Sequence, residues 1–334
     1  MRRLLADRPG EPADVLRLAD GPAEPAPGPG EVSVAVETVG LNFLDVMLCR
    51  GTYPLQPPFP VTPGVELAGR VIGTGPGTEA LAGVDVIACP TLPRGALGET
   101  VTLAAALVTP RPSTIDPIDA AALPVTYQTA WFALERAGLA AGQTVLVHAG
   151  AGGVGIAATQ LARAAGAEVI CTAGGPEKTA RCRANGAGLA IDYRADDFVT
   201  AVREATGGAG VDIVIDPVGG EVFTRSLDCL AFEGRLVAVG TAGGNPPPVD
   251  PLRLIVGNAT VVGLSWGSAY PWARPEAVRE AYDRLFALHA AGAVRPPVSQ
   301  VVSLAETPAA MADLAARRTT GKLVVRVADG AERS

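Results

Sequence analysis

The chain has 334 residues, of which 48% are hydrophobic and 18% charged, and its formal net charge is −7. This length exceeds what one small core requires and predicts a globular protein with two domains. Because the chain is acidic and has no run of basic residues, we expect neither nucleic acid nor an anionic membrane surface as a partner. The sequence contains no stretch of about 18 consecutive apolar residues, so no membrane-spanning segment is expected. The amino terminus reaches Asp7, Arg8 and Pro9 before an apolar stretch develops, unlike a signal peptide, so a cytoplasmic location is expected.

The cysteines and histidines are few and scattered. An odd number of cysteines without framework spacing is typical of reduced thiols in a cytosolic protein. A zinc ion requires clustered Cys and His ligands, so no zinc site and no other metal site is expected. The residues concerned are Cys49, Cys89, Cys171, Cys182, Cys229, His148 and His289.

The first third of the chain has the pattern of a β domain. Residues 21–30 are rich in Pro and Gly and predict a surface turn. From Glu31 to about Pro110, short segments with alternating apolar residues are separated by turns such as Gly73-Thr-Gly-Pro-Gly77. This spacing indicates a compact, barrel-like β domain. From Asp119 the pattern changes to helix.

Residues 144–175 predict a nucleotide-binding β-α-β unit. A strand at 144–148 is followed by a glycine turn, a helix from Ile156 to about Ala165 and a second strand at 168–172. Such a turn brings backbone N–H groups against a pyrophosphate at the positive end of a helix. In this glycine-rich chain the G-x-G-x-x-G pattern alone is weak, and the flanking strand and helix carry the prediction. The turn consists of Gly150, Gly152, Gly153, Val154 and Gly155.

The end of the second strand indicates which dinucleotide is bound. An NAD site normally has Asp or Glu there, to accept hydrogen bonds from the ribose diol. This chain instead has Ala173, Gly174 and Gly175, followed by Lys178 and Arg181. Space and positive charge suit a 2′-phosphate, so NADPH is the favoured cofactor. The alternative is that Lys178 and Arg181 belong to an ordinary solvated helix face.

The β-α alternation continues after this unit. Strands are expected at 189–193, 211–216, 235–240 and 260–265, with helices at 196–205 and 223–231. Short strands that alternate with helices predict an α/β fold with a doubly wound parallel sheet. The ligand is expected at the carboxyl ends of these strands.

The last 69 residues are expected to return to the first domain. They contain an aromatic segment at 266–272, expected as a loop, helices at 275–291 and 305–317, and a final strand at 322–327. We expect this tail to pack on the amino-terminal β domain.

Several motifs together resemble the zinc-independent NADPH:quinone oxidoreductases, the zeta-crystallin-like family of the medium-chain dehydrogenase/reductase superfamily. The resemblance implies a GroES-like β-barrel catalytic domain from residues 1–124 and 266–334, a Rossmann NADPH-binding domain from residues 125–265, and a homodimer joined through the Rossmann sheets. The motifs are Gly40-Leu-Asn-Phe-Leu-Asp45, Arg50-Gly-Thr-Tyr-Pro54, Pro63-Gly-Val-Glu-Leu-Ala-Gly69, Ala149-Gly-Ala-Gly-Gly-Val-Gly155, Asp216-Pro-Val-Gly-Gly220 and Gly321-Lys322.

The same resemblance argues against alcohol oxidation. The zinc-containing alcohol dehydrogenases of the superfamily have a Cys ligand at the position of Asn42 and a His at the position of Val65. Their structural zinc lobe would follow Asp85, where this chain has only a short link. Without those ligands no Lewis acid is expected to polarise an alcohol.

The resemblance also implies site residues. Contacts to the 2′-phosphate fall on Gly174, Lys178 and Tyr193, Asn42 lies beside the nicotinamide, and Gly240 and Thr241 contact the nicotinamide half of the cofactor. Arg317 matches a further cofactor contact. The alternatives are a strand-end aromatic for Tyr193 and a solvated helix-end residue for Arg317.

The expected reaction is the NADPH-dependent reduction of a quinone or an α,β-unsaturated carbonyl by direct hydride transfer without a metal. Catalysis then consists chiefly of placement, with polar groups near the acceptor oxygen. Asn42 and Tyr53 are the candidates, since related 2-enoyl-thioester reductases have a Tyr in the same Gly-x-Tyr-Pro setting as a proposed proton donor. We expect residues 266–272 and Phe59 to cover the acceptor. The alternatives are a turn-forming Asn and a packed loop Tyr.

Two other functions remain open. One is an enoyl-thioester reductase that acts on enoyl-CoA or polyketide-type substrates. The other is an NADPH-binding protein without catalytic turnover.

Overall fold

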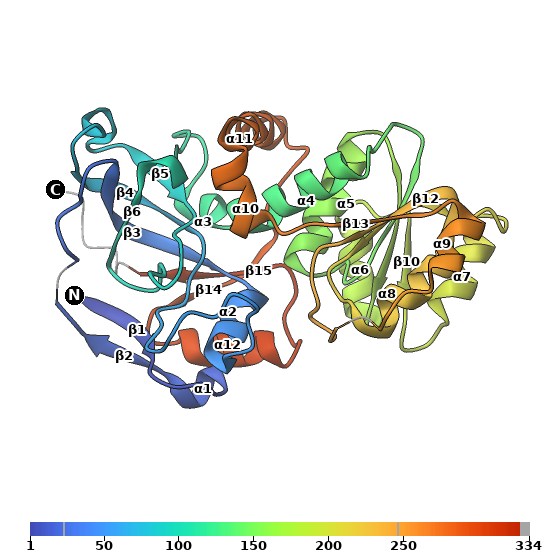
Figure 1. The fold of residues 1–334 in the computed structure, drawn as a ribbon, viewed down its shortest axis with the longest axis horizontal. Helices are drawn as coiled ribbons and strands as arrows, with labels where there is room; N and C mark the ends of the chain where they lie inside the picture. Colours follow the sequence, from blue (N-terminus) through green and yellow to red (C-terminus); the bar gives the residue numbers. More distant parts are fainter. Residues whose placement is uncertain (23, 246, 328–334) are drawn as a thin grey trace. The chain divides into compact units, whose positions relative to one another are not determined.

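The structure, a computed structural model, describes residues 1–22, 24–245 and 247–327 of the chain (Figure 1). It divides into two compact units, each with its own large sheet. The first unit comprises Met1–Val125, Pro271–Arg279 and Pro296–Ser334, and the second comprises Thr126–Tyr270 and Glu280–Arg295. Within the described ranges, no helix combines the length and the apolar character that crossing a bilayer demands.

The first unit is built on a seven-stranded sheet. Its strands are β3 (Glu31–Leu41), β4 (Leu67–Thr74), β5 (Asp85–Ala88), β6 (Thr100–Ala104), β7 (Val108–Pro110), β14 (Val298–Ser303) and β15 (Lys322–Arg326). The long strand β3 is central and pairs antiparallel with β4, β6 and β15. Val32, Val34 and Val36 of β3 are buried and alternate with partly exposed residues, because successive side chains of a strand point to opposite faces. The sheet confirms the expected GroES-like domain, and β15 joins the carboxyl-terminal part of the chain to it.

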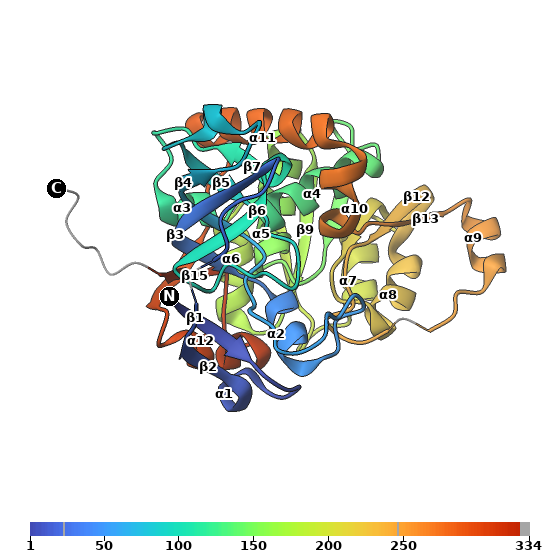
Figure 2. The ribbon, with the colours of Figure 1, turned by 60° about the vertical axis from the view of Figure 1, so that its left-hand side comes forward.

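Short elements cover this sheet. They are β1 (Arg2–Ala6), α1 (Pro12–Val15), β2 (Leu16–Asp20), α2 (Phe43–Arg50), η1 (Glu79–Leu81), η2 (Ala105–Leu107), α3 (Pro117–Ala121) and α12 (Thr307–Ala315). Strands β1 and β2 form an antiparallel hairpin beside which α1, α2 and α12 pack together (Figure 2). The hairpin and α2 are additions to the elements expected from the sequence.

The second unit is a Rossmann domain. Its six-stranded parallel sheet has the order β10-β9-β8-β11-β12-β13. The order reverses between β8 and β11, which is the arrangement of a doubly wound fold. Figure 1 shows α5 and α6 on one side of the sheet and α7 and α8 on the other. The elements are α4 (Pro124–Arg136), β8 (Thr144–Val147), α5 (Gly153–Ala164), β9 (Glu168–Ala173), α6 (Pro176–Ala184), β10 (Leu189–Asp192), α7 (Phe198–Ala205), β11 (Val211–Asp216), α8 (Gly220–Ser226), η3 (Leu227–Cys229), β12 (Leu230–Ala238), α9 (Pro251–Gly257) and β13 (Thr260–Gly263).

Two local expectations are wrong. The helix expected at 223–231 ends at Ser226, and β12 begins at Leu230 because Leu230 is buried in the sheet core. The aromatic segment 266–272 is not a loop but part of helix α10 (Trp266–Ala273). Trp266 and Tyr270 are one helical turn apart and both buried, and the Tyr270 ring lies 4.2 Å from that of Phe132. Trp266 and Tyr270, which were expected to cover the acceptor, are therefore buried on one face of α10.

The boundaries of the units differ from the simple division at residue 265. Residues 271–279 belong to the first unit, but 280–295 return to the second. Helix α11 (Pro275–Ala290) supplies Ala281 and Leu285 to the buried core, and the Gln160 side chain hydrogen-bonds the backbone of Arg295.

Candidate functional site

The glycine turn after β8 is packed closely at all three of its glycines, and least closely at Gly152. A Cβ at Gly150 would lie 2.7 Å from Cys171 Cβ, and a Cβ at Gly155 would lie 2.3 Å from the Ala149 carbonyl oxygen. A side chain at either position would clash with neighbouring protein atoms, so packing alone requires glycine at both. At Gly152 a Cβ would lie 3.3 Å from the Ala149 carbonyl oxygen, a tight contact but less severe than those at Gly150 and Gly155. The lack of a side chain at Gly152 also permits the close approach of a phosphate to the backbone of the turn.

Helix α5 begins directly at this turn, at Gly153, and the helix is 12 residues long. The backbone N–H groups of its first turn, which includes Gly153 and Val154, have no partner within the helix. Together with the helix dipole they attract an anion. The turn therefore fits the pyrophosphate of a dinucleotide.

The edge of the sheet next to the turn offers positive and polar groups. A Cβ at Gly174 would lie 2.7 Å from the Tyr193 hydroxyl and 2.9 Å from Arg194 Nε, so both side chains lie directly over this glycine. Lys178 lies half-buried in the first turn of α6. These groups gather where β9 and β10 end, as a 2′-phosphate would require.

Asp192 joins the ends of β9 and β10 through backbone hydrogen bonds. Its Oδ1 accepts hydrogen bonds from the backbone N–H groups of Gly175 (2.8 Å) and Arg194 (3.0 Å). These bonds lower the pKa of the Asp192 carboxyl, chiefly through Gly175. Sequence reasoning missed Arg194. The signal was present in Ile-Asp-Tyr-Arg, where Arg directly follows the Tyr that was selected.

The loops after β11 and β12 form a second cradle at the same end of the sheet. Gly220 N donates to Gly244 O (2.9 Å) and Gly243 N donates to Val218 O (2.7 Å), so the two loops are joined. Gly240 and Thr241 lie at the start of the second loop, and a Cβ at Gly240 would lie 2.9 Å from Pro217 O.

Asp216, at the end of β11, stabilises the first of these two loops by hydrogen bonds to its backbone. Its Oδ1 accepts hydrogen bonds from the N–H groups of Val218 (2.7 Å) and Gly219 (3.1 Å). Burial raises the pKa of its carboxyl. The proposed cofactor residues of the second unit thus lie at the carboxyl ends of the parallel strands. They are Gly150 to Gly155, Gly174, Lys178, Tyr193, Gly240 and Thr241.

His148 is a structural histidine beneath this edge. Ser226 Oγ donates to Val222 O (2.6 Å), so the Ser226 oxygen accepts from His148 Nε2 (2.7 Å). Nδ1 then accepts from the Thr172 hydroxyl (2.8 Å). Burial lowers the pKa of His148 to about 3, so the ring is neutral near pH 7. A buried neutral ring with both nitrogens occupied does not suit proton transfer to a substrate.

The first unit brings three separated motifs together in one buried network. Lys322 Nζ donates to Glu66 Oε1, to Asn42 Oδ1 (2.9 Å) and to the Leu41 carbonyl (2.9 Å). Glu66 Oε2 accepts from Val125 N (2.7 Å). Glu66 has no exposed surface and Lys322 is 2% exposed.

Two neighbours of this network shape its geometry. A Cβ at Gly40 would lie 2.6 Å from Glu66 Oε1, so glycine permits the carboxylate to approach β3. Asp45, completely buried, accepts from Asn42 N (2.8 Å) and Gly64 N (2.7 Å). Burial is the dominant influence on Asp45 and raises its pKa to about 6. Hydrogen bonds therefore hold Asn42, at the start of α2, through both its backbone N–H and its side chain.

The two catalytic candidates lie at opposite ends of α2. Asn42 precedes the helix and is partly exposed, while Tyr53 follows it and is also partly exposed. The Tyr53 hydroxyl makes no hydrogen bond to any residue that the structure describes, and burial raises its pKa. The phenol therefore keeps its proton at neutral pH and is available as a donor.

The other selected residue of the first unit is Arg317. It follows α12, is exposed, and has a left-handed backbone with φ of 57°. No group of three or more His, Cys, Asp or Glu side chains that could hold a metal ion occurs in the described part of the chain.

Comparison with known proteins gives the family context for this geometry. The alcohol dehydrogenase GroES-like domain family matches residues 28–113, and the zinc-binding dehydrogenase family matches residues 153–286. A quinone oxidoreductase of Pseudomonas aeruginosa is 38% identical over 318 residues, which are 93% of this chain and 95% of that protein.

Two further similarities concern cofactor and substrate class. The crystal structure of Escherichia coli quinone oxidoreductase complexed with NADPH has a TM-score of 0.91 and 31% identity, and the match covers 98% of this chain and 100% of that one. The phthioceranic/hydroxyphthioceranic acid synthase of Mycobacterium tuberculosis is 36% identical over 306 residues, which are 90% of this chain but 14% of the synthase.

Proposed function

Since the chain belongs to the zinc-independent quinone oxidoreductase-like family of the medium-chain dehydrogenases/reductases and is an NADPH-dependent oxidoreductase, we propose that it reduces quinones or related α,β-unsaturated carbonyls. When bound, NADPH supplies the hydride. The observation that carries the proposal is the glycine turn at the start of α5 in the second unit, which fits the pyrophosphate of a dinucleotide. Within the first unit, burial raises the pKa of the Tyr53 hydroxyl, which makes it a neutral proton donor.

The residues of the second unit bind and orient the cofactor in this proposal. The turn from Gly150 to Gly155 binds the pyrophosphate, and Gly174, Lys178 and Tyr193 bind the 2′-phosphate, joined by Arg194. Gly240 and Thr241 place the nicotinamide half. Arg317 of the first unit remains a proposed cofactor contact.

The residues of the first unit match an acceptor that needs little acid catalysis. Glu66 is already neutralised by Lys322, and Asn42 is engaged with both, so neither carboxylate nor ammonium is free to transfer a proton. A quinone suits such a site because the reduced oxygen is a stabilised anion that takes a proton from water. The Tyr53 phenol would be needed only for a less activated acceptor such as an enone.

The proposal is tested by anaerobic incubation of the purified protein with NADPH and 9,10-phenanthrenequinone. Equimolar loss of NADPH and gain of hydroquinone supports two-electron quinone reduction. NADPH that is bound but never consumed would replace this proposal with that of a binding protein without turnover.

An enoyl-thioester reductase is the second candidate function. The similarity to a segment of the acid synthase supports it, and so does the free hydroxyl of Tyr53. In that case Tyr53 protonates the carbon next to the thioester carbonyl, and crotonyl-CoA is a better acceptor than any quinone.

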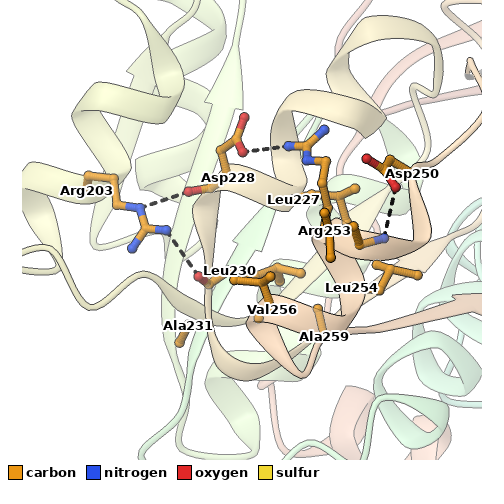
Figure 3. A pocket seen from close by; sticks show the side chains of 12 residues that line it. Arg203, Leu227, Asp228, Leu230, Ala231, Asp250, Arg253, Leu254, Val256 and Ala259 are labelled. Atoms are coloured by element: carbon orange, nitrogen blue, oxygen red, sulfur yellow. Dashed lines mark hydrogen bonds and ion pairs between the residues drawn. The ribbon is translucent and has the colours of Figure 1, made fainter.

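We also propose that the protein acts in the cytoplasm as a homodimer joined through β13. Strand β13 is the edge of the parallel sheet. Phe232 of β12, the strand next to β13, and Ile255 and Val256 of α9 are 72%, 69% and 75% exposed, and exposed apolar side chains of this size are of the kind that a partner covers. A hollow of about 470 Å³ adjoins these residues and is lined by residues of β12 and α9. Figure 3 shows side chains that line it, with Arg253 paired to Asp228.

The dimer is tested by light scattering coupled to size-exclusion chromatography. Ile255→Glu together with Val256→Glu should convert a dimeric wild type to monomer. A wild-type protein that is monomeric at micromolar concentration would refute this interface.

A further inference from the structure

Two of the five cysteines lie together against the glycine turn of the second unit. Cys171 belongs to β9 and Cys182 to α6, and neither has any exposed surface. A Cβ at Gly150 would lie 2.8 Å from Cys171 Sγ and 2.9 Å from Cys182 Sγ, so both sulfurs contact the first glycine of the turn. The two thiols are free and hydrogen-bond each other.

Further hydrogen bonds join this pair to the rest of the turn. Thr159 Oγ1 lies 3.2 Å from Cys171 Sγ and donates to the Gly155 carbonyl (2.8 Å). The carbonyl of Thr172, the residue after Cys171, accepts from Gly150 N (2.9 Å). A change in the spacing of the two sulfurs therefore acts on the first and third glycines of the turn.

The two thiols differ in their readiness to ionise. The hydrogen bond from Cys171 lowers the pKa of Cys182, which outweighs the effect of burial, and the charge of Arg183 lowers it further. The same hydrogen bond raises the pKa of Cys171. By contrast, burial raises the pKa of Cys229, in the same unit, to about 12. Because the thiolate is the reactive form of cysteine, Cys182 is the sulfur at which an oxidation begins.

We propose that Cys171 and Cys182 are a modification site, at which a reversible disulfide regulates the binding of NADPH to the glycine turn. The inference rests on the proposed function, which places the pyrophosphate of NADPH at this turn. Disulfides in reducing compartments are usually transient and redox-sensing, which suits a pair that is free in the structure.

Hydrogen peroxide is the oxidant in this proposal, because two thiols shielded from water admit only a small, uncharged reagent. The Cys182 thiolate attacks one oxygen of the peroxide, the O–O bond breaks, hydroxide leaves, and a sulfenic acid forms. Cys171 Sγ then attacks the Cys182 sulfur, the S–O bond breaks, and the Cys171 proton leaves with the hydroxyl group as water. The hydroxide takes up a proton. Two thiols thus lose two electrons, and the peroxide becomes two molecules of water.

The disulfide changes the position of α6 relative to β9. A covalent bond between two sulfurs is about 2 Å long, shorter than the hydrogen bond that it replaces, so α6 is drawn toward the strand. Helix α6 contains Lys178, and β9 ends at Ala173, directly before Gly174. Both residues proposed to bind the 2′-phosphate, together with the turn at Gly150, are therefore displaced from the geometry of the reduced protein.

The experiment oxidises the purified protein with hydrogen peroxide and locates the bond by mass spectrometry of peptides under non-reducing conditions. A protease other than trypsin is needed, because Arg181 and Arg183 flank Cys182. Calorimetry gives the dissociation constant of NADPH before oxidation, after oxidation, and after reduction with dithiothreitol.

Three variants are treated alongside the wild type. Cys182→Ala removes the attacking thiolate. Cys171→Ser keeps a hydroxyl that can donate to Cys182 but cannot form the disulfide. Cys229→Ala is the matched control, because Cys229 is another fully buried thiol of the same unit.

The wild type and Cys229→Ala should each give one linked peptide, which joins Cys171 to Cys182. Oxidation should weaken their NADPH binding about tenfold, the effect of one lost charge-assisted hydrogen bond, and dithiothreitol should restore it. Cys182→Ala should keep its NADPH affinity after the same treatment. In Cys171→Ser the sulfenic acid should persist at Cys182 and be captured by dimedone.

Three results would overturn the inference. They are the absence of the linked peptide from the oxidised wild type, a disulfide that leaves the NADPH affinity unchanged, and a loss of affinity in oxidised Cys182→Ala equal to that of the wild type. Binding is measured without an acceptor, so failure of the proposed reaction on quinones would be seen separately, in the NADPH consumption assay.

Discussion

Arg194 is the residue whose replacement probes the cofactor preference most sharply. Its guanidinium lies beside Gly174 with the Tyr193 hydroxyl, where the 2′-phosphate of NADPH is proposed to bind and where NADH has only a hydroxyl. A charge-assisted hydrogen bond is worth about 1.5–3 kcal/mol, but Arg194 is exposed, and solvent screening reduces the expected loss to about 1–2 kcal/mol. Arg194→Ala should therefore raise the dissociation constant of NADPH by about 5- to 30-fold.

The assay compares NADPH with NADH at low and high salt. The loss in NADPH affinity should shrink at 0.5 M salt, because the Debye length falls below about 10 Å. NADH binding should change by less than about twofold, since it has no phosphate to lose. Arg163→Ala is the matched control, because Arg163 is an exposed arginine of the same unit that pairs with Glu168. Equal losses for NADPH and NADH, or none for either, would refute the placement of the phosphate.

Four further outcomes are expected. Lys178→Ala should weaken NADPH by about 1–3 kcal/mol and leave NADH nearly unchanged, and an unchanged NADPH affinity would remove Lys178 from the phosphate site. Gly152→Val should abolish detectable NADPH binding, because its side chain blocks the approach of the phosphate, and should lower the melting temperature modestly because its Cβ lies 3.3 Å from the Ala149 carbonyl oxygen; tight binding by the variant would disprove the phosphate site. Tyr53→Phe should cut enone turnover far more than quinone turnover, and equal residual rates would exclude Tyr53 as proton donor. His148→Gln should flatten the fall of wild-type stability between pH 6.5 and 4, as followed by melting temperature, and a parallel pH profile would contradict the buried neutral ring.

The sign of the His148 effect follows from its lowered pKa. The folded ring titrates near pH 3, well below the ordinary value of 6.5, so between these values the unfolded chain binds more protons. Stability is therefore lost as the pH falls through this window. Asp45 has the opposite effect on stability. Its pKa in the folded protein is about 6, above the ordinary value of 3.8, so its contribution to folding stability is lost as the pH rises from about 4 to 6. Comparing wild type with the His148 variant isolates the histidine.

The parts of the fold that depend on local pattern could be predicted. The β-α-β unit was predicted because strand, glycine turn and helix are neighbours in the chain, and its helix begins three residues earlier than expected, at Gly153. The alternation of Val32, Val34 and Val36 likewise identified the central strand of the first sheet.

The network around Lys322 could not be predicted, because it depends on pairing between distant segments. Glu66 and Lys322 are separated by 256 positions, and they meet only when β15 pairs with β3. The sequence singled out the motifs that contain Gly40, Asn42 and Lys322, but without strand pairing it could not show that they meet. Helix α10 was missed for a similar reason, since the burial of Tyr270 against Phe132 is a tertiary contact.

The central claim, NADPH-dependent reduction of quinones, is tested most directly by the oxidation of NADPH against four acceptors: 1,4-benzoquinone, 9,10-phenanthrenequinone, a simple enone and crotonyl-CoA, each repeated with NADH. The account predicts that the quinones give the highest kcat/KM and that NADPH is preferred to NADH. Crotonyl-CoA as the best acceptor, or equal rates with NADH, would contradict it.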